Sequence, residues 1–461
     1  MKHFKLIYLF LLLGAGLLSC GDSWLDMKSD KSLVVPTTID DFQSLLNNSY
    51  IMNEQKIFLG DVGADDYYLT YQTWLSVLEE QKNAYVWEED IYNGLSSTNW
   101  SAPYQKIFYA NVVLDGAKKL VPDDVDNGAF NRIVGEANFF RADGFYDIAQ
   151  VFCNQYNVSS AHTDLGIPLR LNSNPNEVTI RSNVFETYTQ IIDDLKLASR
   201  LLPTLSNNKT RPSKAAAFAL LARTYLTMDE YESALLYSDS CLQLQNRLMD
   251  YNLLNSETDY AIPFLNEEVL IHGKQLNALA GNNYFVDSTL YGSYDENDLR
   301  KSIFFKDRGL GGMNFVGSYI GVGNVTGNSF AGIAVDEVYL IRAECNARIG
   351  NLSKALDDIN TLLETRWRNG SFTPLYSESA QEVLEIVLKE RRKQLLFRGL
   401  RWSDLKRLNK DPRFSKSLVR ELNGVTYSLP PNDPKYVYPI PPDVTALTGI
   451  EQNPRNAQQT N

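Results

Sequence analysis

The sequence predicts a mainly α fold, in which a tetratricopeptide-like scaffold of helical pairs carries long irregular loops and a few short strands. Two widely separated segments predict the scaffold, because each has apolar residues at intervals of three and four and a short break in its middle. The segments between them are rich in aromatic residues, Gly, Asn and Pro, which indicates ordered loops. The 461 residues are 44% hydrophobic and 22% charged, as is usual for a folded protein.

The N-terminal segment is predicted to be a targeting signal rather than part of the fold. The apolar run Leu6–Leu18 is too short to cross about 30 Å of hydrocarbon and has the length of a signal-peptide core. It ends in Leu-Leu-Ser-Cys-Gly, which resembles a bacterial lipobox with Cys20 as the acylated residue. We expect residues 1–19 to be a lipoprotein signal peptide and residues 20–36 to be a lipidated tether to a membrane. A secreted protein in which Cys20 is incidental is the alternative.

Residues 37–461 are predicted to form a single helical domain. Residues 216–245 should form two helices with a break at Met228–Glu230, because their sequence of large, small, Tyr and Ala residues lets paired helices nest closely. Residues 336–363 repeat this plan, and Gly350 is placed to end the first helix of that pair. Further amphipathic helices are expected over residues 103–121, 131–152 and 379–398.

Two long insertions interrupt the helices, over residues 60–100 and about residues 250–332. The first is rich in aromatic residues and poor in helix signals. The second is rich in Gly, Asn and Tyr and contains the strand-like runs 268–271 and 315–320. A tail rich in Pro and Asn covers residues 423–455. Because ordered loops on a scaffold usually carry the functional residues, we expect the ligand contacts in the two insertions.

Charge and composition exclude several classes of function. The formal net charge of −12 argues against a nucleic-acid partner, since binding to phosphates needs clustered Lys and Arg. The chain has three His and no C-x-x-C motif, so neither a metal site nor a redox site is indicated, and no cofactor is expected. The acidic run Asp123–Asp126 lacks the spaced oxygen ligands of a calcium loop and is expected to be a helix cap or a turn.

A block of charged residues in the C-terminal third looks like an active site but is expected to be a structural network of ion pairs. An Arg guanidinium can pair with two carboxylates while its stem covers apolar surface. The acidic pairs Asp65-Asp66 and Glu79-Glu80 are expected to lie in solvated loops. Adjacent side chains usually point apart, so these pairs are not expected to converge on a substrate as the two carboxylates of a glycosidase do. No catalytic residue is predicted. The residues of the expected network are Glu390, Arg391, Arg392, Arg398, Arg401, Trp402 and Asp404.

Aromatic residues in the two insertions are the best candidates for ligand contacts. They lack helical spacing and lie among Asn, Gly, Asp and Ser. Flat apolar rings beside amides and carboxylates suit a sugar or a peptide, since rings stack on apolar faces while polar groups bind hydroxyls or amides. Trp100 and Tyr104 are instead expected to pack at the start of the next helix. The predicted ligand-binding residues are Trp74, Trp87 and Tyr291, which we prefer, and Tyr67, Tyr68, Tyr71, Tyr92 and Tyr284.

Six sequence blocks follow the lipobox in order. They are SWLDMKSDKSLVVPTTIDDFQSLLNN, GEANFFRADGFYDIAQVF with DLGIPLR, RPSKAAAFALLARTYLTMDEYESAL, DEVYLIRAECNARIGNLSKALDDIN, KERRKQLLFRGLRWSDLKRL and YPIPPDVTALTGIEQNPR. Together they resemble the SusD/RagB family of outer-membrane nutrient-binding lipoproteins of Bacteroidetes, and Asp22 and Asp26 resemble the surface-export signal of such lipoproteins. Residues 362–367 depart from the V-R-x-R-A run of many members, which indicates a separate branch.

This resemblance implies a non-enzymatic protein on the cell surface that binds a nutrient, with an oligosaccharide expected and a peptide as the alternative. It also implies a partner, a SusC-like TonB-dependent transporter in the outer membrane, over which the protein would swing as a lid while its lipid anchor holds it. Two functions from other classes stay open: a glycan-active enzyme on a helical scaffold, and a tetratricopeptide adaptor for protein assembly.

Overall fold

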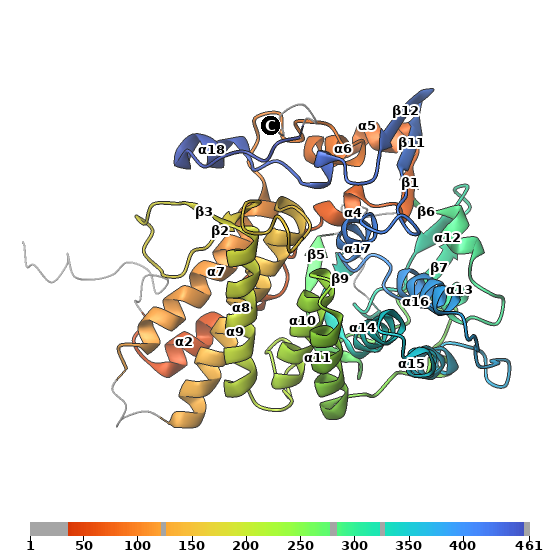
Figure 1. Ribbon diagram of the computed structural model, residues 1–461, viewed down its shortest axis with the longest axis horizontal. Helices are drawn as coiled ribbons and strands as arrows, with labels where there is room; N and C mark the ends of the chain where they lie inside the picture. The colour runs from red at the N-terminus through yellow and green to blue at the C-terminus, as the bar shows by residue number, and fades with distance from the viewer. Residues whose placement is uncertain (1–35, 121–125, 277–283, 323–327, 456–461) are drawn as a thin grey trace, which may run out of the picture.

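The computed structural model describes residues 36–120, 126–276, 284–322 and 328–455, and it confirms the mainly α fold (Figure 1). Cys20, the signal peptide and nearly all of the expected tether lie outside the described residues. No helix within the described ranges has both the length and the apolar character needed to cross a membrane.

The two expected helical pairs are present and lie next to each other (Figure 1). The first consists of α10 (Lys214–Thr227) and α11 (Tyr231–Leu244), and the second of α14 (Val335–Arg348) and α15 (Leu352–Glu364). Gly350 separates α14 from α15 with a φ of +87°, a conformation that glycine adopts without steric cost. Between the helices of the first pair, the Tyr225 and Tyr237 rings stack almost parallel, 5.6 Å apart. α16 (Ala380–Gln394) packs against α14 and α15.

A second group of helices packs beside the first pair (Figure 1). It contains α2 (Ile39–Leu46), α7 (Thr98–Ala117), α8 (Asn127–Phe152) and α9 (Val184–Leu201). The Asp126 carboxylate accepts a hydrogen bond from the Gly128 amide at 2.8 Å and caps α8, as expected for the end of the acidic run. Residues 121–125 of that run lie outside the described ranges. Trp100 and Tyr104 pack in the first turns of α7, as expected, with ring centroids 5.1 Å apart.

The remaining elements are short, and many gather at one end of the helical layers (Figure 1). In the described ranges the strands form six antiparallel pairs. The pairs are β1 (Tyr67–Leu69) with β6 (Tyr284–Val286), β2 (Leu165–Pro168) with β3 (Arg181–Asn183), β4 (Val269–Ile271) with β10 (Ile333–Ala334), β5 (Lys274–Leu276) with β9 (Asn328–Phe330), β7 (Phe305–Asp307) with β8 (Met313–Phe315), and β11 (Leu418–Leu422) with β12 (Val425–Leu429). The short helices are α3 (Ser49–Met52), α4 (Leu59–Gly63), α5 (Tyr71–Ser76), α6 (Glu79–Tyr85), α12 (Ser288–Gly292), α13 (Arg300–Phe304), α17 (Arg401–Leu408) and α18 (Pro442–Thr448), with 3-10 turns at Tyr251–Leu253 and Pro434–Tyr436.

Two details differ from the sequence prediction. The strand expected over residues 315–320 is wrong, because β8 ends at Phe315. Residues 60–100 are not an irregular surface loop. They form α4, β1, α5 and α6, and much of their apolar surface is buried in the core. In this region, aromatic residues without helical spacing therefore belong to short helices and strands that pack on the core, and not only to loops.

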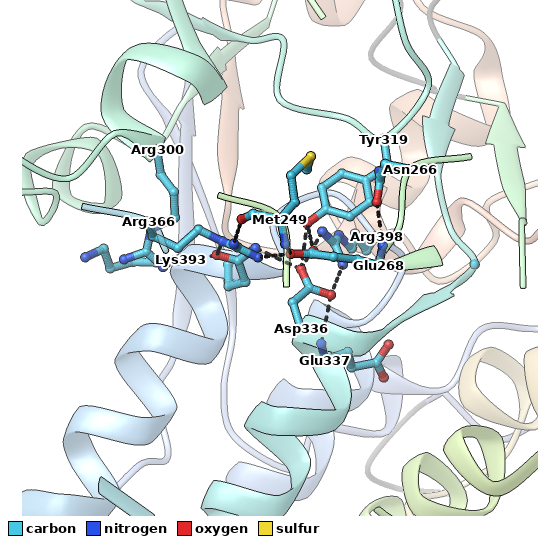
Figure 2. Close-up of polar contacts among 12 residues, drawn as sticks. Met249, Asn266, Glu268, Arg300, Tyr319, Asp336, Glu337, Arg366, Lys393 and Arg398 are labelled. Atoms are coloured by element: carbon cyan, nitrogen blue, oxygen red, sulfur yellow. Dashed lines mark hydrogen bonds and ion pairs between the residues drawn. The ribbon is translucent and has the colours of Figure 1, made fainter. Parts of the chain in front are cut away.

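The expected ion-pair network is present: Arg391 pairs with Asp404 at 2.9 Å, and Glu390 pairs with Arg300 at 2.6 Å. Arg398, also expected, lies in the buried cluster that Figure 2 shows. Asp336, at the start of α14, accepts hydrogen bonds from both terminal nitrogens of Arg398, at 2.9 and 2.8 Å. Burial alone would raise the pKa of Asp336, but the Arg398 guanidinium outweighs it and holds that pKa below its usual value. Arg366 donates to Glu268 at 2.6 Å, and the Tyr319 hydroxyl lies between the Glu268 and Asp336 carboxylates. Segments far apart in the sequence are thereby joined.

The C-terminal segment returns to the first third of the chain. The Tyr438 amide donates to the Val151 carbonyl at 3.0 Å, and the Asn453 side-chain amide donates to the carbonyls of Phe152 and Tyr438, both at 2.9 Å. The Arg455 guanidinium donates to the Glu88 carbonyl at 2.6 Å. The last described residues therefore complete the packing of α8 and of the segment that follows α6.

Candidate functional site

Three aromatic residues on β1 and α5, close together in the sequence, stay partly exposed, and we call them the aromatic platform: Tyr68, Tyr71 and Trp74. Tyr71 and Trp74 lie one turn apart on α5 and their rings stack, with centroids 5.8 Å apart and planes at 27°. Tyr68, on β1, is 40% exposed, and its ring packs against Phe285 at 5.5 Å. All three keep part of their rings accessible, so they can offer apolar faces to a ligand.

The local sequence holds α5 in place. Thr70 caps the helix, since its hydroxyl accepts a hydrogen bond from the Thr73 amide at 3.2 Å. The Trp74 indole N–H donates to the Lys82 carbonyl on α6 at 2.9 Å. This bond fixes the orientation of the indole ring while leaving its face partly open. Leu75 and Leu78 beside it are exposed, which extends the apolar surface.

Two arginines hold together the elements that flank the platform residues in the sequence. Arg420, on β11, stacks on the Tyr85 ring at 3.5 Å and donates to the carbonyls of Val62 and Ala64 at 3.1 and 2.6 Å. Arg401 makes a two-point contact with the Asp65 carboxylate, at 2.7 and 3.1 Å. These contacts fix α17 and β11 to residues 62–65, just before β1 and α5, so a ligand at the platform would meet a preformed surface.

Tyr291 lies on the neighbouring helix α12. This helix follows β6, the partner strand of β1, and the Asp287 amide between them donates to the Asp66 carbonyl at 2.9 Å. The Tyr291 ring is half-buried. It lies nearly perpendicular to the Phe305 ring, with centroids 5.4 Å apart, and the Lys301 ammonium lies 5.4 Å from the Tyr291 ring centroid. It can contribute a partly open ring near β1, but its partners already cover much of it.

Four of the predicted ligand-binding residues lie in the core instead, and for them the prediction is corrected. Trp87 and Tyr92 are each 1% exposed, and Tyr67 and Tyr284 are each 4% exposed. The polar atom of each ring donates to a backbone carbonyl: Trp87 to Gly63, Tyr92 to Pro439, Tyr67 to Val62 and Tyr284 to Phe315. Trp87 also has a φ of +56°, which a bulky residue keeps only when its surroundings hold it. These rings have no face free for a ligand.

The acidic pair Asp65-Asp66 is more buried than expected, whereas the Glu79 side chain stays 34% exposed. Asp65 and Asp66 are not solvated, because Arg392 and Arg401 pair with them below the platform. Burial raises the pKa of Asp66, whereas the Arg401 guanidinium overcomes the effect of burial at Asp65 and holds its pKa well below the usual value. Glu79 pairs with Lys82 at 2.5 Å. Each of these carboxylates thus has a structural partner.

Two hollows on the surface were not predicted from the sequence. One, of about 320 Å³, lies on the helical pairs, where Arg342 bridges Asp239 and Asp358 at 2.7 and 2.6 Å. The other, of about 350 Å³, is lined by amides, hydroxyls, two Lys and Tyr436. The residues that line each hollow come from separate segments of the chain, so no local sequence motif could predict either hollow. Within the described ranges no cluster of His, Cys, Asp and Glu could hold a metal ion.

Comparisons with known proteins agree with this architecture. Residues 23–226 match a SusD-like family described as starch-binding and associating with the outer membrane, and residues 335–455 match the SusD family. SusD-like protein P2 of Formosa agariphila is 24% identical over 88% of this chain and 91% of its own length.

Solved structures of similar fold carry related names. A putative sugar binding protein from Bacteroides vulgatus is 23% identical with a TM-score of 0.74, covering 91% of this chain and 99% of its own. A SusD superfamily protein from Bacteroides thetaiotaomicron is 22% identical with the same TM-score, covering 91% and 100%. A laminarin binding SusD-like protein is 19% identical with a TM-score of 0.65, covering 90% and 98%.

Proposed function

Because the chain belongs to the SusD/RagB family, we propose that it binds a carbohydrate nutrient at the cell surface and delivers it to a TonB-dependent transporter of the outer membrane. It acts as a binding protein without catalysis. An oligosaccharide is the ligand that we propose first, and a peptide is the alternative.

The observation that carries this proposal is the aromatic platform. Tyr71 and Trp74 present stacked, partly exposed rings on a helix that a cap and an indole hydrogen bond hold in place. Sugar rings have apolar faces that stack on such aromatic rings, and a preformed surface loses little entropy when the ligand binds. Names of similar proteins, among them a laminarin binding protein and a putative sugar binding protein, support the carbohydrate class.

The remaining part of the proposal concerns attachment and transfer. Acylation of Cys20 and a tether through residue 36 would leave the folded part free to open and close over a transporter while it stays attached. A ligand held between both proteins would favour the closed state, since a ligand shifts an equilibrium only by its differential affinity for the two states.

The test of ligand binding is a titration of the mature protein with soluble starch, laminarin and peptides. Wild type should bind a carbohydrate, and the double variant Tyr71→Ala/Trp74→Ala should bind it at least about tenfold more weakly, if each stacked ring contributes roughly 1 kcal/mol. The matched control is Trp100→Phe, a change in the core at the start of α7, where the ring packs on Tyr104 and Phe152. Equal affinity in wild type and in the platform variant would disprove the site.

A further inference from the structure

The helix that carries Tyr71 and Trp74 depends on contacts with its neighbours. α5 is six residues long and none of its residues is buried, although the Tyr71 and Trp74 rings pack partly against the core. A helix this short is not stable by itself, so contacts with the rest of the protein must fix its position. Two hydrogen bonds join this part of the chain to α6.

The two bonds hold α5 near each of its ends. Toward the end of the helix, the Trp74 indole N–H donates to the Lys82 carbonyl at 2.9 Å. At its start, the Leu69 amide donates to the Tyr85 hydroxyl, also at 2.9 Å. Leu69 is the last residue of β1 and directly precedes Thr70, the cap of α5. Because Lys82 and Tyr85 lie about one turn apart on α6, the two bonds together fix the direction of α5 relative to α6.

α6 is itself held firmly by its surroundings. Tyr85 is 2% exposed, and the Arg420 guanidinium lies 3.5 Å from the centroid of its ring. The Glu80 carboxylate accepts a hydrogen bond from the Asn99 side-chain amide at 3.2 Å, which joins α6 to α7. The Tyr85 hydroxyl is therefore an acceptor with a fixed position, and loss of its bond would free Leu69 and the start of α5.

We propose that Tyr85 is a positioning residue for the aromatic platform, an inference that rests on the proposed function. The buried Tyr85 ring has no face for a ligand, so Tyr85 acts through Leu69 on the direction of α5 and of the Trp74 ring. Without the hydroxyl, α5 keeps its bond at Trp74 and loses the one at its start. The platform then has to be ordered when the ligand binds, and this ordering lowers the affinity.

The chain offers a matched pair of variants for the test. Tyr85→Phe keeps the ring beside Arg420 and removes only the hydroxyl. The control is Tyr294→Phe, because Tyr294 is also 2% exposed and its hydroxyl donates to the Lys393 carbonyl on α16 at 2.8 Å. Each change breaks a buried hydrogen bond and should lower the melting temperature. A change in the platform is expected in Tyr85→Phe alone.

The position of α5 is measured by fluorine NMR of the mature chain labelled with fluorotryptophan, in which Trp74→Phe assigns the Trp74 resonance. In Tyr85→Phe this resonance should shift or broaden, while the resonance of Trp100, at the start of α7, stays in place. No aromatic ring is lost, so a changed Trp74 resonance reports movement of α5. Tyr294→Phe should leave both resonances unchanged.

Titration with laminarin and soluble starch measures the effect on binding. Tyr85→Phe should bind the carbohydrate about fivefold more weakly than wild type, and Tyr294→Phe should bind it as wild type does. The inference is wrong if Tyr85→Phe leaves the Trp74 resonance unchanged, if Tyr294→Phe changes it equally, or if Tyr85→Phe keeps the affinity of wild type.

Two further outcomes are also decisive. If wild type binds neither polysaccharide, the proposed function fails, and the fluorine spectra alone decide whether Tyr85 positions Trp74. If Tyr85→Phe does not fold, hydrogen exchange of the wild-type Leu69 amide decides. Slow exchange supports its bond to the Tyr85 hydroxyl, and fast exchange overturns the inference.

Discussion

A tryptophan ring can stabilise a fold from inside or offer a face to a ligand, and Trp74 and Trp87 differ in this respect. Both indole nitrogens donate to backbone carbonyls, at 2.9 Å for Trp74 and 3.0 Å for Trp87. Only the Trp74 ring stays partly exposed, whereas Trp87 is 1% exposed beneath the Arg420 guanidinium. A bonded indole nitrogen is therefore compatible with either role, and the exposure of the ring face decides between them.

Substitution by alanine should separate the two roles. Trp87→Ala should lower the free energy of unfolding by about 3–5 kcal/mol, because it leaves a large cavity in the core. Trp74→Ala should lower it by about 1 kcal/mol, the value of one hydrogen bond, and should weaken carbohydrate binding. Urea unfolding and ligand titration of both variants measure these effects. Similar losses of stability in the two variants would contradict the assignment.

Asp61 gives the protein a pH-dependent stability. Burial raises the pKa of this carboxyl to about 7, against the opposing hydrogen bond from Gln275. A carboxyl with a raised pKa binds its proton more tightly in the folded state, so stability is greatest below the unfolded pKa and falls as pH rises from about 4 through 7. The full penalty is on the order of 4 kcal/mol.

Asp61→Asn removes this titration. The variant should therefore be more stable than wild type at pH 8 and should lose that advantage near pH 4. Thermal unfolding of both proteins across this pH range measures the difference in stability between the variant and wild type. Other titrating groups contribute equally to both proteins, so their effects cancel in this difference. A constant difference at every pH would show that the Asp61 carboxyl does not titrate in this interval.

At the scale of elements, the helical pairs could be predicted from sequence, but the environment of the aromatic residues could not. Apolar residues recur at intervals of three and four along residues 216–245, a pattern that depends only on the local geometry of a helix. The predicted break before Tyr231 is therefore confirmed. The burial of Trp87 depends on Arg420, which lies far away in the sequence. Likewise, no local pattern in the sequence links Asn154 to Tyr436, which line the same surface hollow.

Gly350 tests how the second helical pair is joined. Its φ is +87°, and no atom lies within 4 Å of the position where a Cβ would stand, so Gly350→Ala changes only backbone strain. The free energy of unfolding should fall by about 1–2 kcal/mol. Gly292, at the end of α12, also has open space but no positive φ. Gly292→Ala should therefore be neutral or slightly stabilising, and chemical denaturation that showed equal losses at both positions would exclude strain as the cause.

At the scale of the whole molecule, the buried ion pairs hold distant segments together (Figure 2). Asp336→Asn leaves Arg398 without its charged partner and should cost about 3–5 kcal/mol. The control is Glu296→Gln, which breaks an exposed pair with Lys301 and should cost less than about 1 kcal/mol. Differential scanning calorimetry distinguishes the two. An unchanged melting temperature in Asp336→Asn would argue against a structural role for this network.

The proposed attachment and partner are also tested on the whole molecule. A fatty-acid analogue should label wild type and not Cys20→Ala, and added protease should remove the protein from intact cells. Purification from outer membranes should recover a large β-barrel protein with it. Recovery without such a partner, from membranes that still contain the labelled lipoprotein, would refute the proposed transporter complex.

The return of the C-terminal segment sets an order for biosynthesis. Arg455 bonds to the Glu88 carbonyl and Tyr92 bonds to the Pro439 carbonyl, so the segment behind the aromatic platform lacks its partners until the ribosome has made nearly the whole chain. Domains usually begin to fold from their N-terminal side during synthesis. Here the segment around Glu88 and Tyr92 completes its packing only after the C-terminal segment has been made. A premature stop codon near the 3′ end of the gene would therefore remove contacts of Glu88 and Tyr92, far from the lesion in sequence.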